Sequence, residues 1–530
     1  MRLWRGRLSV RIGVDVGGTN TDAVLMEGVN VLAAVKRPTS ADVLTGIQEA
    51  LAALGGSPNF DAKRIEAVML GTTHFTNAVV SMKGLTPTAA IRLSLPSSSG
   101  VPPMVDWPET LANVLGRHVY EVAGGHEFSG REIAELDMET LASIAADIEI
   151  KGLTAIAITG VFSPLKVEHE LAARDYLRQR LPHARISVSH EIGRVGLIER
   201  ENATIINASL LELAAKATDA FKGALADSGI TAPLYLSQND GTLMDVEFAK
   251  RFPVTTFSSG PTNSMRGAAL LSGLKDCIVI DIGGTTADIG VLVGGFPRQA
   301  TAVVDIGGVR TNFRMPDLLP MGIGGGSLVD LDNGDVGPAS VGYRLATEAL
   351  VFGGSTLTAS DIAVAAGIID IGDKTKVAHL DSAKVSTALH NIRERIATTA
   401  DMMRVSREAV PVVLVGGGSI LIDGDLPGLG PVIRPPYADC ANAVGAAIAQ
   451  IGAEVDRVVT LEGKDRAAEL AAISEEARQQ VEAAGAIASS IEIVEMDEVP
   501  IAYLPNDCVR VRVKAVGDLA LGGLRQGAAA

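Results

Sequence analysis

Apolar runs of strand length alternate with helical periodicity along most of this chain. Runs at 11–16, 23–26 and 30–36 predict three strands around a glycine turn, and a helical pattern follows over 41–54. A further apolar run at 65–70 predicts a buried strand. Strands that alternate with helices predict α/β layers, and the opening three-strand meander predicts a mixed rather than a purely parallel sheet.

The same plan returns in the second half of the sequence. Apolar runs at 277–280, 289–293 and 412–415 predict strands, and the patterns at 383–403 and 438–451 predict helices. The repetition predicts two halves of similar architecture.

The sequence between the halves has other features. A loop rich in serine and proline at 95–108 indicates an insertion, a long helical pattern covers 193–225, and a strand is expected at 254–257. After the second half, a helix at 464–484 and two late strands predict an appendage. The predicted units are 1–84 and 85–190 (the N-terminal half-domain with its insertion), 191–275 (long helix and connection), 276–452 (second half-domain) and 453–530 (C-terminal helix and strands).

One motif occurs twice, at Asp15–Asp22 and at Asp281–Asp288. Both copies read D-x-G-G-T-x-x-D between two apolar runs, which predicts a strand, a tight turn and a second strand. Glycines let the turn bring backbone N–H groups close to an anion, and aspartates can hold Mg²⁺. Two such hairpins facing each other would bind a nucleoside triphosphate from both sides, with Asp15 and Asp281 as catalytic and metal-binding residues. The predicted phosphate-binding residues are Gly17, Gly18, Thr19, Asn20, Thr21, Gly283, Gly284, Thr285 and Thr286.

Two later glycine-rich stretches could complete a nucleotide site. Gly416-Gly417-Gly418-Ser419 follows an apolar strand, where a purine or ribose could lie against bare backbone, and the same reasoning covers Gly324 and Gly325. A plain strand-to-helix turn is the alternative for each. The pattern G-x-x-x-x-G-K-[ST] does not occur, which excludes a P-loop enzyme, and no dinucleotide fingerprint is found.

Polar residues at other element ends are candidates for substrate contact. Thr72, Thr73 and His74 follow a strand, where ligand contacts are common in α/β sheets. His190 precedes the long helix and Glu201 and Asn202 lie within it; acidic residues there also complement the helix dipole, which is a purely structural explanation. The predicted catalytic residues include His74 and Glu201, and the predicted substrate-binding residues are Thr72, Thr73, His190 and Asn202.

Composition narrows the function further. The net charge is −16, from 46 Lys+Arg and 62 Asp+Glu, which makes nucleic acid an unexpected partner. The three cysteines are far apart and no apolar run approaches the ~20 residues of a membrane span, so a cytoplasmic protein without a membrane segment is expected. The histidines lack the close spacing of a zinc site, and no transition metal is predicted.

These motifs together resemble the hydantoinase/oxoprolinase family, in particular its A-type (alpha) subunit, within the actin, sugar kinase and heat-shock chaperone ATPase superfamily. The residues that carry the resemblance are the two D-x-G-G-T-x-x-D turns, Gly71-Thr72-Thr73 with Thr76-Asn77, Gly124–Glu127, Val161–Pro164, Ser189–Glu191, Glu199–Asn202, Asn239–Gly241, Ser258–Pro261 and Asn442–Gly445. The resemblance implies a duplicated actin-like ATPase fold: two ribonuclease H-like halves with mixed sheets and a central nucleotide cleft, plus inserted and C-terminal segments.

The resemblance also implies an activity and partners. It implies ATP- and Mg²⁺-dependent opening of a cyclic amide such as a hydantoin, oxoproline or lactam, in which ATP phosphorylates the amide oxygen. The chain is shorter than a fused oxoprolinase and contains no B-type region, so a B-type (beta) partner subunit and an oligomer are expected. His74-Phe75 departs from the small residues expected in that segment, so the resemblance does not identify the substrate ring. A nucleotide-switched activator or assembly ATPase, and a metabolite kinase of the same superfamily, are the alternative functions.

Overall fold

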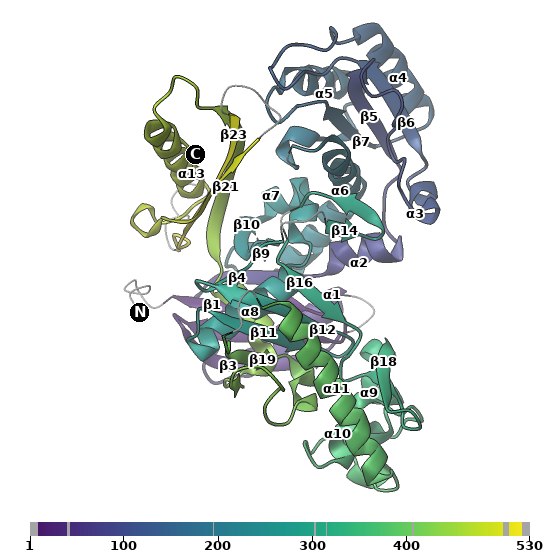
Figure 1. Ribbon diagram of the computed structural model, residues 1–530, viewed down its shortest axis with the longest axis vertical. Helices are drawn as coiled ribbons and strands as arrows, with labels where there is room; N and C mark the ends of the chain where they lie inside the picture. Colours follow the sequence, from purple (N-terminus) through teal and green to yellow (C-terminus); the bar gives the residue numbers. More distant parts are fainter. Residues whose placement is uncertain are drawn as a thin grey trace.

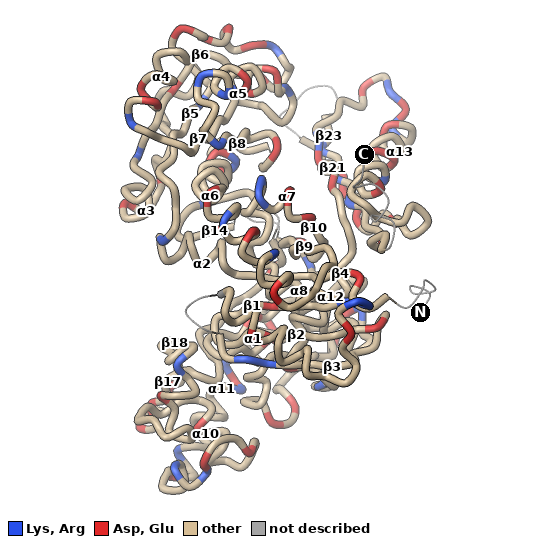
Figure 2. Tube along the Cα trace, turned by 180° about the vertical axis from the view of Figure 1, so that it is seen from behind, with Lys and Arg blue, Asp and Glu red and all other residues tan. Residues whose placement is uncertain are grey.

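A computed structural model of the 530-residue chain describes residues 9–39, 43–193, 195–300, 304–313, 315–404, 408–501 and 508–521. Two α/β halves lie against each other, with the inserted segment and the C-terminal segment on the side of the first half (Figure 1). Acidic and basic residues are interspersed along the trace (Figure 2). No helix of the described ranges combines the length and the apolar character that crossing a membrane requires.

The first half is built on a mixed sheet with the order β3-β2-β1-β4-β9. β1 (Val10–Val16), β2 (Asn20–Glu27) and β3 (Asn30–Pro38) form the predicted antiparallel meander. β4 (Ile65–Thr72) and β9 (Leu234–Ser237) then add in parallel to β1. The carboxyl ends of β1, β4 and β9 therefore lie along one edge of the sheet.

The second half repeats this topology with the order β13-β12-β11-β19-β20. β11 (Cys277–Ile282), β12 (Ala287–Val293) and β13 (Phe296–Pro297) are antiparallel, whereas β19 (Val412–Val415) and β20 (Val432–Ile433) run parallel to β11. A further strand, β16 (Leu318–Met321), pairs with β12 on the side opposite β11, next to β13. The predicted α/β class with two mixed sheets is confirmed.

Two helices from different parts of the sequence cross between the halves, α8 (Ser259–Ser272) and α12 (Ala441–Ala447). Glycine allows the close approach: a Cβ on Gly267 would lie 2.0 Å from the carbonyl oxygen of Ala441, and one on Gly445 would lie 1.8 Å from that of Asn263. This packing fixes the N-terminal ends of both helices beside the strand ends of the two sheets.

The predicted insertion is a separate parallel sheet with the order β6-β5-β7-β8. Its elements are β5 (Thr88–Leu95), β6 (His118–Ala123), α4 (Met138–Ile150), β7 (Ala155–Gly160), α5 (Glu168–Arg180) and β8 (Arg185–Val188). The strands of this sheet have a core of their own with α4 and α5.

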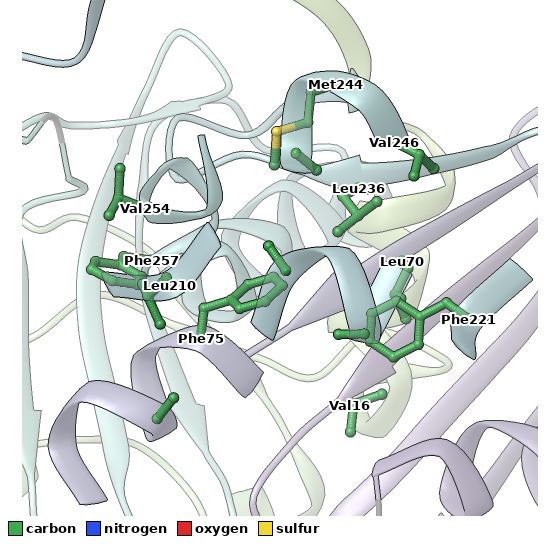
Figure 3. Packing of buried hydrophobic residues seen from close by; sticks show 14 of the residues in the cluster. Val16, Leu70, Phe75, Leu210, Phe221, Leu236, Met244, Val246, Val254 and Phe257 are labelled. Atoms are coloured by element: carbon green, nitrogen blue, oxygen red, sulfur yellow. The ribbon is translucent and has the colours of Figure 1, made fainter. Parts of the chain in front are cut away.

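The long predicted helix, α6 (Leu197–Asp227), connects the insertion to the first half. It is buried on most of its faces near its start, and its side chains Leu210 and Phe221 enter the core that contains Phe75, Leu236 and Phe257 (Figure 3). Because this core includes residues of β1, β4 and β9, α6 supports the sheet that carries the first hairpin.

The C-terminal segment extends the first sheet, which corrects the expectation of an appendage. β21 (Gln450–Thr460) pairs in parallel with β10 (Thr242–Asp245), and β23 (Cys508–Gly517) lies between β21 and β22 (Glu492–Pro500). The first sheet therefore has nine strands, in the order β22-β23-β21-β10-β9-β4-β1-β2-β3. α13 (Arg466–Ala483) covers this extension.

Two predicted elements differ from the structure. Residues 254–257 were expected as a strand, but the chain forms a 3-10 turn at Pro253–Thr256, and the proline ring removes a backbone donor. The helix expected at 438–451 is only α12, because the chain enters β21 at Gln450. Residues 41 and 42 of the first predicted helix lie outside the described ranges.

The remaining elements are α1 (Val43–Gly55), α2 (His74–Ser81), α3 (Glu109–Val114), α7 (Val246–Arg251), β14 (Val304–Ile306), β15 (Val309–Thr311), β16 (Leu318–Met321), β17 (Ser327–Asp330), β18 (Asp335–Ser340), α9 (Leu345–Glu348), α10 (Ala359–Ala365) and α11 (Ser382–Met402).

Candidate functional site

The two glycine turns have the same backbone geometry. The amide of Gly17 donates to the carbonyl of Asn20 at 3.0 Å, and the amide of Gly283 donates to the carbonyl of Thr286 at 2.8 Å. Each turn links a pair of antiparallel strands in which the two aspartates of the motif lie opposite each other. The repeated motif therefore folds as the same hairpin twice.

The hairpins touch at their turns. A Cβ atom on Gly284 would lie 2.3 Å from Thr19 Oγ1, so only a glycine fits there without displacing Thr19. Both turns line one cleft of about 500 Å³, which contains Gly17, Gly18, Thr19, Asn20, Gly283, Gly284, Thr285 and Thr286. The sequence prediction that the hairpins face one another across a cleft is confirmed.

Four aspartates of the two hairpins line this cleft: Asp15 and Asp22 are buried, and Asp281 and Asp288 are partly buried. Burial, together with the negative charge of Asp22, raises the pKa of Asp15 to about 7. Burial raises the pKa of Asp22 to about 6 against the opposing effect of Lys36, and burial with the charge of Asp281 raises the pKa of Asp288 to about 7. Burial also raises the pKa of Asp281. At Asp15, Asp22 and Asp281, the effect of burial on the pKa therefore outweighs that of the Lys36 charge.

Three residues that were not predicted as site residues complete the charged part of the cleft. Lys36 Nζ lies 2.6 Å and 2.7 Å from the two carboxylate oxygens of Asp22. Asn442 Nδ2 lies 3.3 Å from Asp15 Oδ2, and Asp439 adds a fifth aspartate. Lys36 lies on β3, the strand after the hairpin, and Asn442 lies in the first turn of α12. Neither residue belongs to the repeated motif that predicted the site.

The donor set fits a hard divalent cation such as Mg²⁺. Among the described lining residues, five aspartates face a single lysine, and a triphosphate would add further negative charge. Asp15 Oδ1 is buried without a hydrogen-bond partner, which leaves one carboxylate oxygen for a metal ion or its water. Asp15 and Asp281, the predicted metal residues, are part of this set.

The two glycine-rich stretches pack against the second hairpin. The amides of Gly325 and Gly326 donate to the carbonyls of Gly283 and Gly284 at 3.0 Å and 2.7 Å. Gly325 lines the cleft, as do Gly416, Gly417 and Gly418. Two predicted residues, Gly324 and Ser419, are absent from the described lining of the cleft. Gly324 packs against the second hairpin, where a Cβ would lie 2.6 Å from the amide nitrogen of Thr285, and Ser419 is buried.

An apolar wall, which the sequence did not reveal, lies beside these glycines. It consists of Leu345, Phe352, Ile369, Ile371 and Ile420. These side chains come from α9, the segments on both sides of α10, and the turn after β19. Bare glycine backbone opposite apolar side chains suits a flat heterocyclic base.

The other end of the cleft is formed by Thr73 and by Gly260 and Pro261 in the first turn of α8. Thr72 is buried beside it, and its Oγ1 accepts a hydrogen bond from the amide of His74 at 3.1 Å. The His74 ring lies edge-to-face with Phe75, outside the described lining of the cleft. At the N-terminal end of α8, the amides of Ser259 and Gly260 are suited to an anion, because the first turn of a helix offers them no intrahelical acceptor.

Other predicted site residues lie away from this cleft. Thr21 is fully buried beneath α1, 3.4 Å from Thr39 Oγ1, because alternate strand residues point to opposite faces. Glu201 forms a buried ion pair with Arg92 at 2.5 Å, and Asn202 accepts a hydrogen bond from Trp107 at 2.7 Å. These contacts join α6 to the insertion, so Glu201 and Asn202 lie outside the described lining of the cleft, and their roles stay predictions. His190 lines a second cavity of about 480 Å³.

Three possible metal ligands that the sequence reasoning did not connect also converge in the insertion. Atoms of His126, Glu132 and His169 lie within 4.8 Å of one another. The amide of Gly125 donates to His169 Nδ1 at 3.0 Å, which places the ring proton on Nε2, 3.4 Å from Glu132. In this state Nε2 has no lone pair to offer to a metal ion. Hydrogen bonding within the protein therefore explains why these three side chains lie together.

Known proteins share this fold and these motifs. The description "Hydantoinase/oxoprolinase N-terminal region" matches residues 11–181, and "Hydantoinase/oxoprolinase" matches residues 200–415. The caprolactamase subunit alpha of Pseudomonas jessenii is 25% identical over 430 residues, covering 76% of this chain and 60% of that protein. The acetophenone carboxylase gamma subunit of Aromatoleum aromaticum is also 25% identical over 430 residues, covering 73% and 57%.

Two solved structures have the same fold over nearly the whole chain. The ATP-dependent caprolactamase from Pseudomonas jessenii superposes with a TM-score of 0.77 at 18% identity, covering 96% of this chain and 87% of that chain. Nucleotide-free acetone carboxylase superposes with a TM-score of 0.68 at 17% identity, covering 97% and 88%. The chain spans less than two thirds of the length of the curated relatives it matches. With both family regions matched in order, the chain belongs to the hydantoinase/oxoprolinase family.

Proposed function

We propose that this chain is the ATP-binding subunit of an enzyme that opens a cyclic amide at the expense of ATP. The observation that carries the proposal is the pair of touching hairpins, whose aspartates line one cleft with an apolar wall. Relatives named caprolactamase and acetophenone carboxylase subunits support activation of a carbonyl compound, and two of the related proteins are called ATP-dependent.

ATP and Mg²⁺ fit the two ends of the cleft. The base would lie between the glycines 416–418 and the apolar wall, and the phosphates would lie between the hairpins. Asp15 and Asp281 would hold Mg²⁺, directly or through water, and the ion would neutralise charge on the phosphates. Thr19 and Thr285 would donate hydrogen bonds from the two turns, and the N-terminal end of α8 would stabilise charge at the phosphoryl group.

The chemistry needs ATP because resonance stabilises an unstrained amide. Transfer of the γ-phosphoryl group to the amide oxygen makes the ring carbon a better electrophile. Water then adds to that carbon, the carbon–nitrogen bond breaks with a proton added to the nitrogen, and an acyl phosphate of the opened chain remains. A second water releases phosphate and leaves a carboxylate. Positioning and charge neutralisation are the main demands on the protein in the first step.

We further propose that the working enzyme contains a B-type subunit and more than one chain. Two of the matched relatives are named as subunits, alpha in one and gamma in the other. The partner would supply parts of the hydrolytic steps that this chain does not carry.

Phosphate release tests the proposal. The purified chain, alone and together with a B-type subunit, is incubated with MgATP and with hydantoin, 2-pyrrolidinone, ε-caprolactam or 5-oxoproline. We expect at least one ring to accelerate phosphate release and to yield the open-chain acid by mass spectrometry. Indifference to every ring, with or without the partner, would rule the proposal out, and a stable phosphorylated product would indicate a kinase.

A further inference from the structure

Three charged side chains form a row across the first hairpin and the strand beside it. Asp15 on β1 lies opposite Asp22 on β2, and Asp22 lies opposite Lys36 on β3. Residues that lie opposite each other in antiparallel strands point to the same face of the sheet. All three side chains line the cleft between the hairpins. The row therefore joins a predicted metal residue to a lysine within one cleft.

The second hairpin repeats the aspartates but not the cation. Asp281 on β11 lies opposite Asp288 on β12, and the residue opposite Asp288 on β16 is Pro320. Proline carries no charge, so this row ends without a cation. Within the part of the cleft lining that the structure describes, Lys36 is the only Lys or Arg residue. The protein's positive charge in the described lining therefore comes from the first half alone.

Asp22 holds Lys36 but does not engage its whole ammonium group. Lys36 Nζ lies 2.6 Å and 2.7 Å from the two carboxylate oxygens of Asp22. An ammonium group has three N–H donors, and no other described residue accepts the third. The Lys36 side chain is 29% exposed and lines the cleft, so an anion bound there can reach it. One donor of Lys36 is therefore available to a ligand.

The same contact keeps Lys36 charged. Burial alone would lower the pKa of Lys36, but the carboxylate of Asp22 raises it above its ordinary value. Burial raises the pKa of Asp15 and of Asp281, and the charge of Lys36 opposes this effect at both residues. The ammonium group therefore acts on aspartates of both hairpins, between which the phosphates of a bound nucleotide would lie.

A nucleoside triphosphate in this cleft needs a cation from the protein. Five aspartates line the cleft, and Mg²⁺ neutralises only part of the negative charge of a triphosphate. A lysine that is already fixed beside the phosphates compensates more of this charge with little reorganisation. The alternative is that Lys36 serves only to neutralise Asp22. Its exposed side chain and its third donor favour contact with a ligand.

We propose that Lys36 binds the phosphate chain of the nucleotide and that Asp22 is the residue that positions it. The inference rests on the ATP-binding part of the proposed function. Two N–H groups of Lys36 stay on the carboxylate of Asp22, and the third donates to a phosphate oxygen. No covalent bond to Lys36 forms or breaks, because its contribution to phosphoryl transfer is a fixed positive charge.

Lys36→Met gives the first test, with Arg37→Met as the matched control. Arg37 is the next residue of β3, is exposed and lies outside the described lining of the cleft. In calorimetry with MgATP and the full chain, we expect Kd to rise about 10-fold or more in Lys36→Met, because a hydrogen bond between charged groups is lost. Arg37→Met should change Kd little, and Lys36→Arg should recover part of the affinity. Unchanged affinity in folded Lys36→Met would overturn the inference.

Asp22→Asn separates phosphate binding from neutralisation of Asp22. If Lys36 only offsets the charge of Asp22, Lys36→Met should not affect Kd for MgATP in an Asp22→Asn background. We expect the loss of about 10-fold or more to persist in that background. The double variant lacks the carboxylate that Lys36 pairs with, so this comparison decides even where Lys36→Met alone does not fold. Equal Kd values for Asp22→Asn and the double variant would overturn the inference.

The inference and the proposed function can fail separately. If a ring accelerates phosphate release while Lys36→Met binds MgATP as tightly as the wild type, only the assignment of Lys36 is wrong. If no ring has any effect while Lys36→Met weakens MgATP binding, the opening of a cyclic amide is ruled out and the assignment of Lys36 stands. Absence of MgATP binding in the wild-type chain would overturn both.

Discussion

The aspartates of the nucleotide cleft are set to respond to both protons and cations. Without a cation, burial and mutual repulsion keep Asp15 and Asp288 partly protonated near neutral pH, since the pKa of each is raised to about 7. A divalent cation favours the ionised form of the same groups. Protons and Mg²⁺ therefore compete for the carboxylates of these aspartates.

This competition predicts a pH dependence of stability. The pKa of Asp15 is raised from 3.8 to about 7 by folding, so its contribution to stability is complete below pH ~4 and is lost as the pH rises through about 7. Without ligands, thermal melts should show Tm falling between pH 5 and 8, and Asp15→Asn should fall less steeply. The increase in Tm on adding MgATP should grow over the same interval; an increase that shrinks toward pH 8 would contradict this account.

Glu201 allows a structural role to be separated from a catalytic one. Its carboxylate and the Arg92 guanidinium are both almost fully buried and lie 2.5 Å apart. Glu201→Gln would leave Arg92 as an unpaired buried charge, and we expect a loss of about 3–5 kcal/mol in the free energy of unfolding. Urea titration measures this loss, and activity per folded molecule should stay near wild type. Normal stability with lost turnover would instead return Glu201 to the catalytic residues.

At the scale of elements, the close contact between the two hairpins requires glycine at position 284. Substitutions at this contact test whether the hairpins must touch to bind ATP. Gly284→Ala places a Cβ against Thr19, so the turns must separate, and we expect ATP affinity to fall at least 10-fold in calorimetry. Thr19→Gly removes every side-chain atom that this Cβ would meet. In the Thr19→Gly background, Gly284→Ala should therefore change ATP affinity little. Equal losses in both backgrounds would show that the hairpins do not depend on this contact.

The C-terminal strands offer a matched pair of valines. Val511 in β23 is fully buried between the extended sheet and α13, whereas Val499 on the neighbouring edge strand β22 is 55% exposed. Val511→Asp buries an unpaired charge and should cost about 3 kcal/mol or more, and Val499→Asp should change stability by less than ~0.5 kcal/mol. Thermal or urea unfolding compares them. Similar small effects would mean that the segment is an appendage after all.

The sequence predicted those elements whose signals are local. The hairpins follow from a motif in which every glycine, threonine and aspartate lies within eight residues, and the repetition of that motif identified the cleft. The helix expected over 438–451 is shorter because a parallel strand pairing with β10 takes residues from Gln450 onward, and that pairing joins segments some 200 residues apart. No local pattern records such a pairing.

The same limit applies to the site: the sequence predicts the residues within the motif but not those that the fold brings to it. Asp15 and Asp281 belong to the motif, but Lys36, Asp439 and Asn442 reach the cleft through the meander and through the crossing of α8 with α12. The apolar wall for the base comes from short segments between residues 345 and 420 that have no recognisable pattern. Glu201 was predicted as a site residue from its place in the polar stretch near the start of the long helix, and its partner Arg92 lies in the insertion.

At the scale of the whole molecule, both halves contribute to one cleft, which we propose is the nucleotide site. Residues 17–20 of the first half, 283–286 of the second and the glycines 416–418 all line the same cleft. Hydrogen exchange followed by mass spectrometry should show slower exchange in all three segments when MgATP is added, because the ligand would bridge them. The inserted sheet, 88–188, should change little, and Asp281→Asn should abolish the effect in both halves at once. Protection confined to one hairpin would mean that the nucleotide binds to a single half, and the shared cleft would then have another purpose.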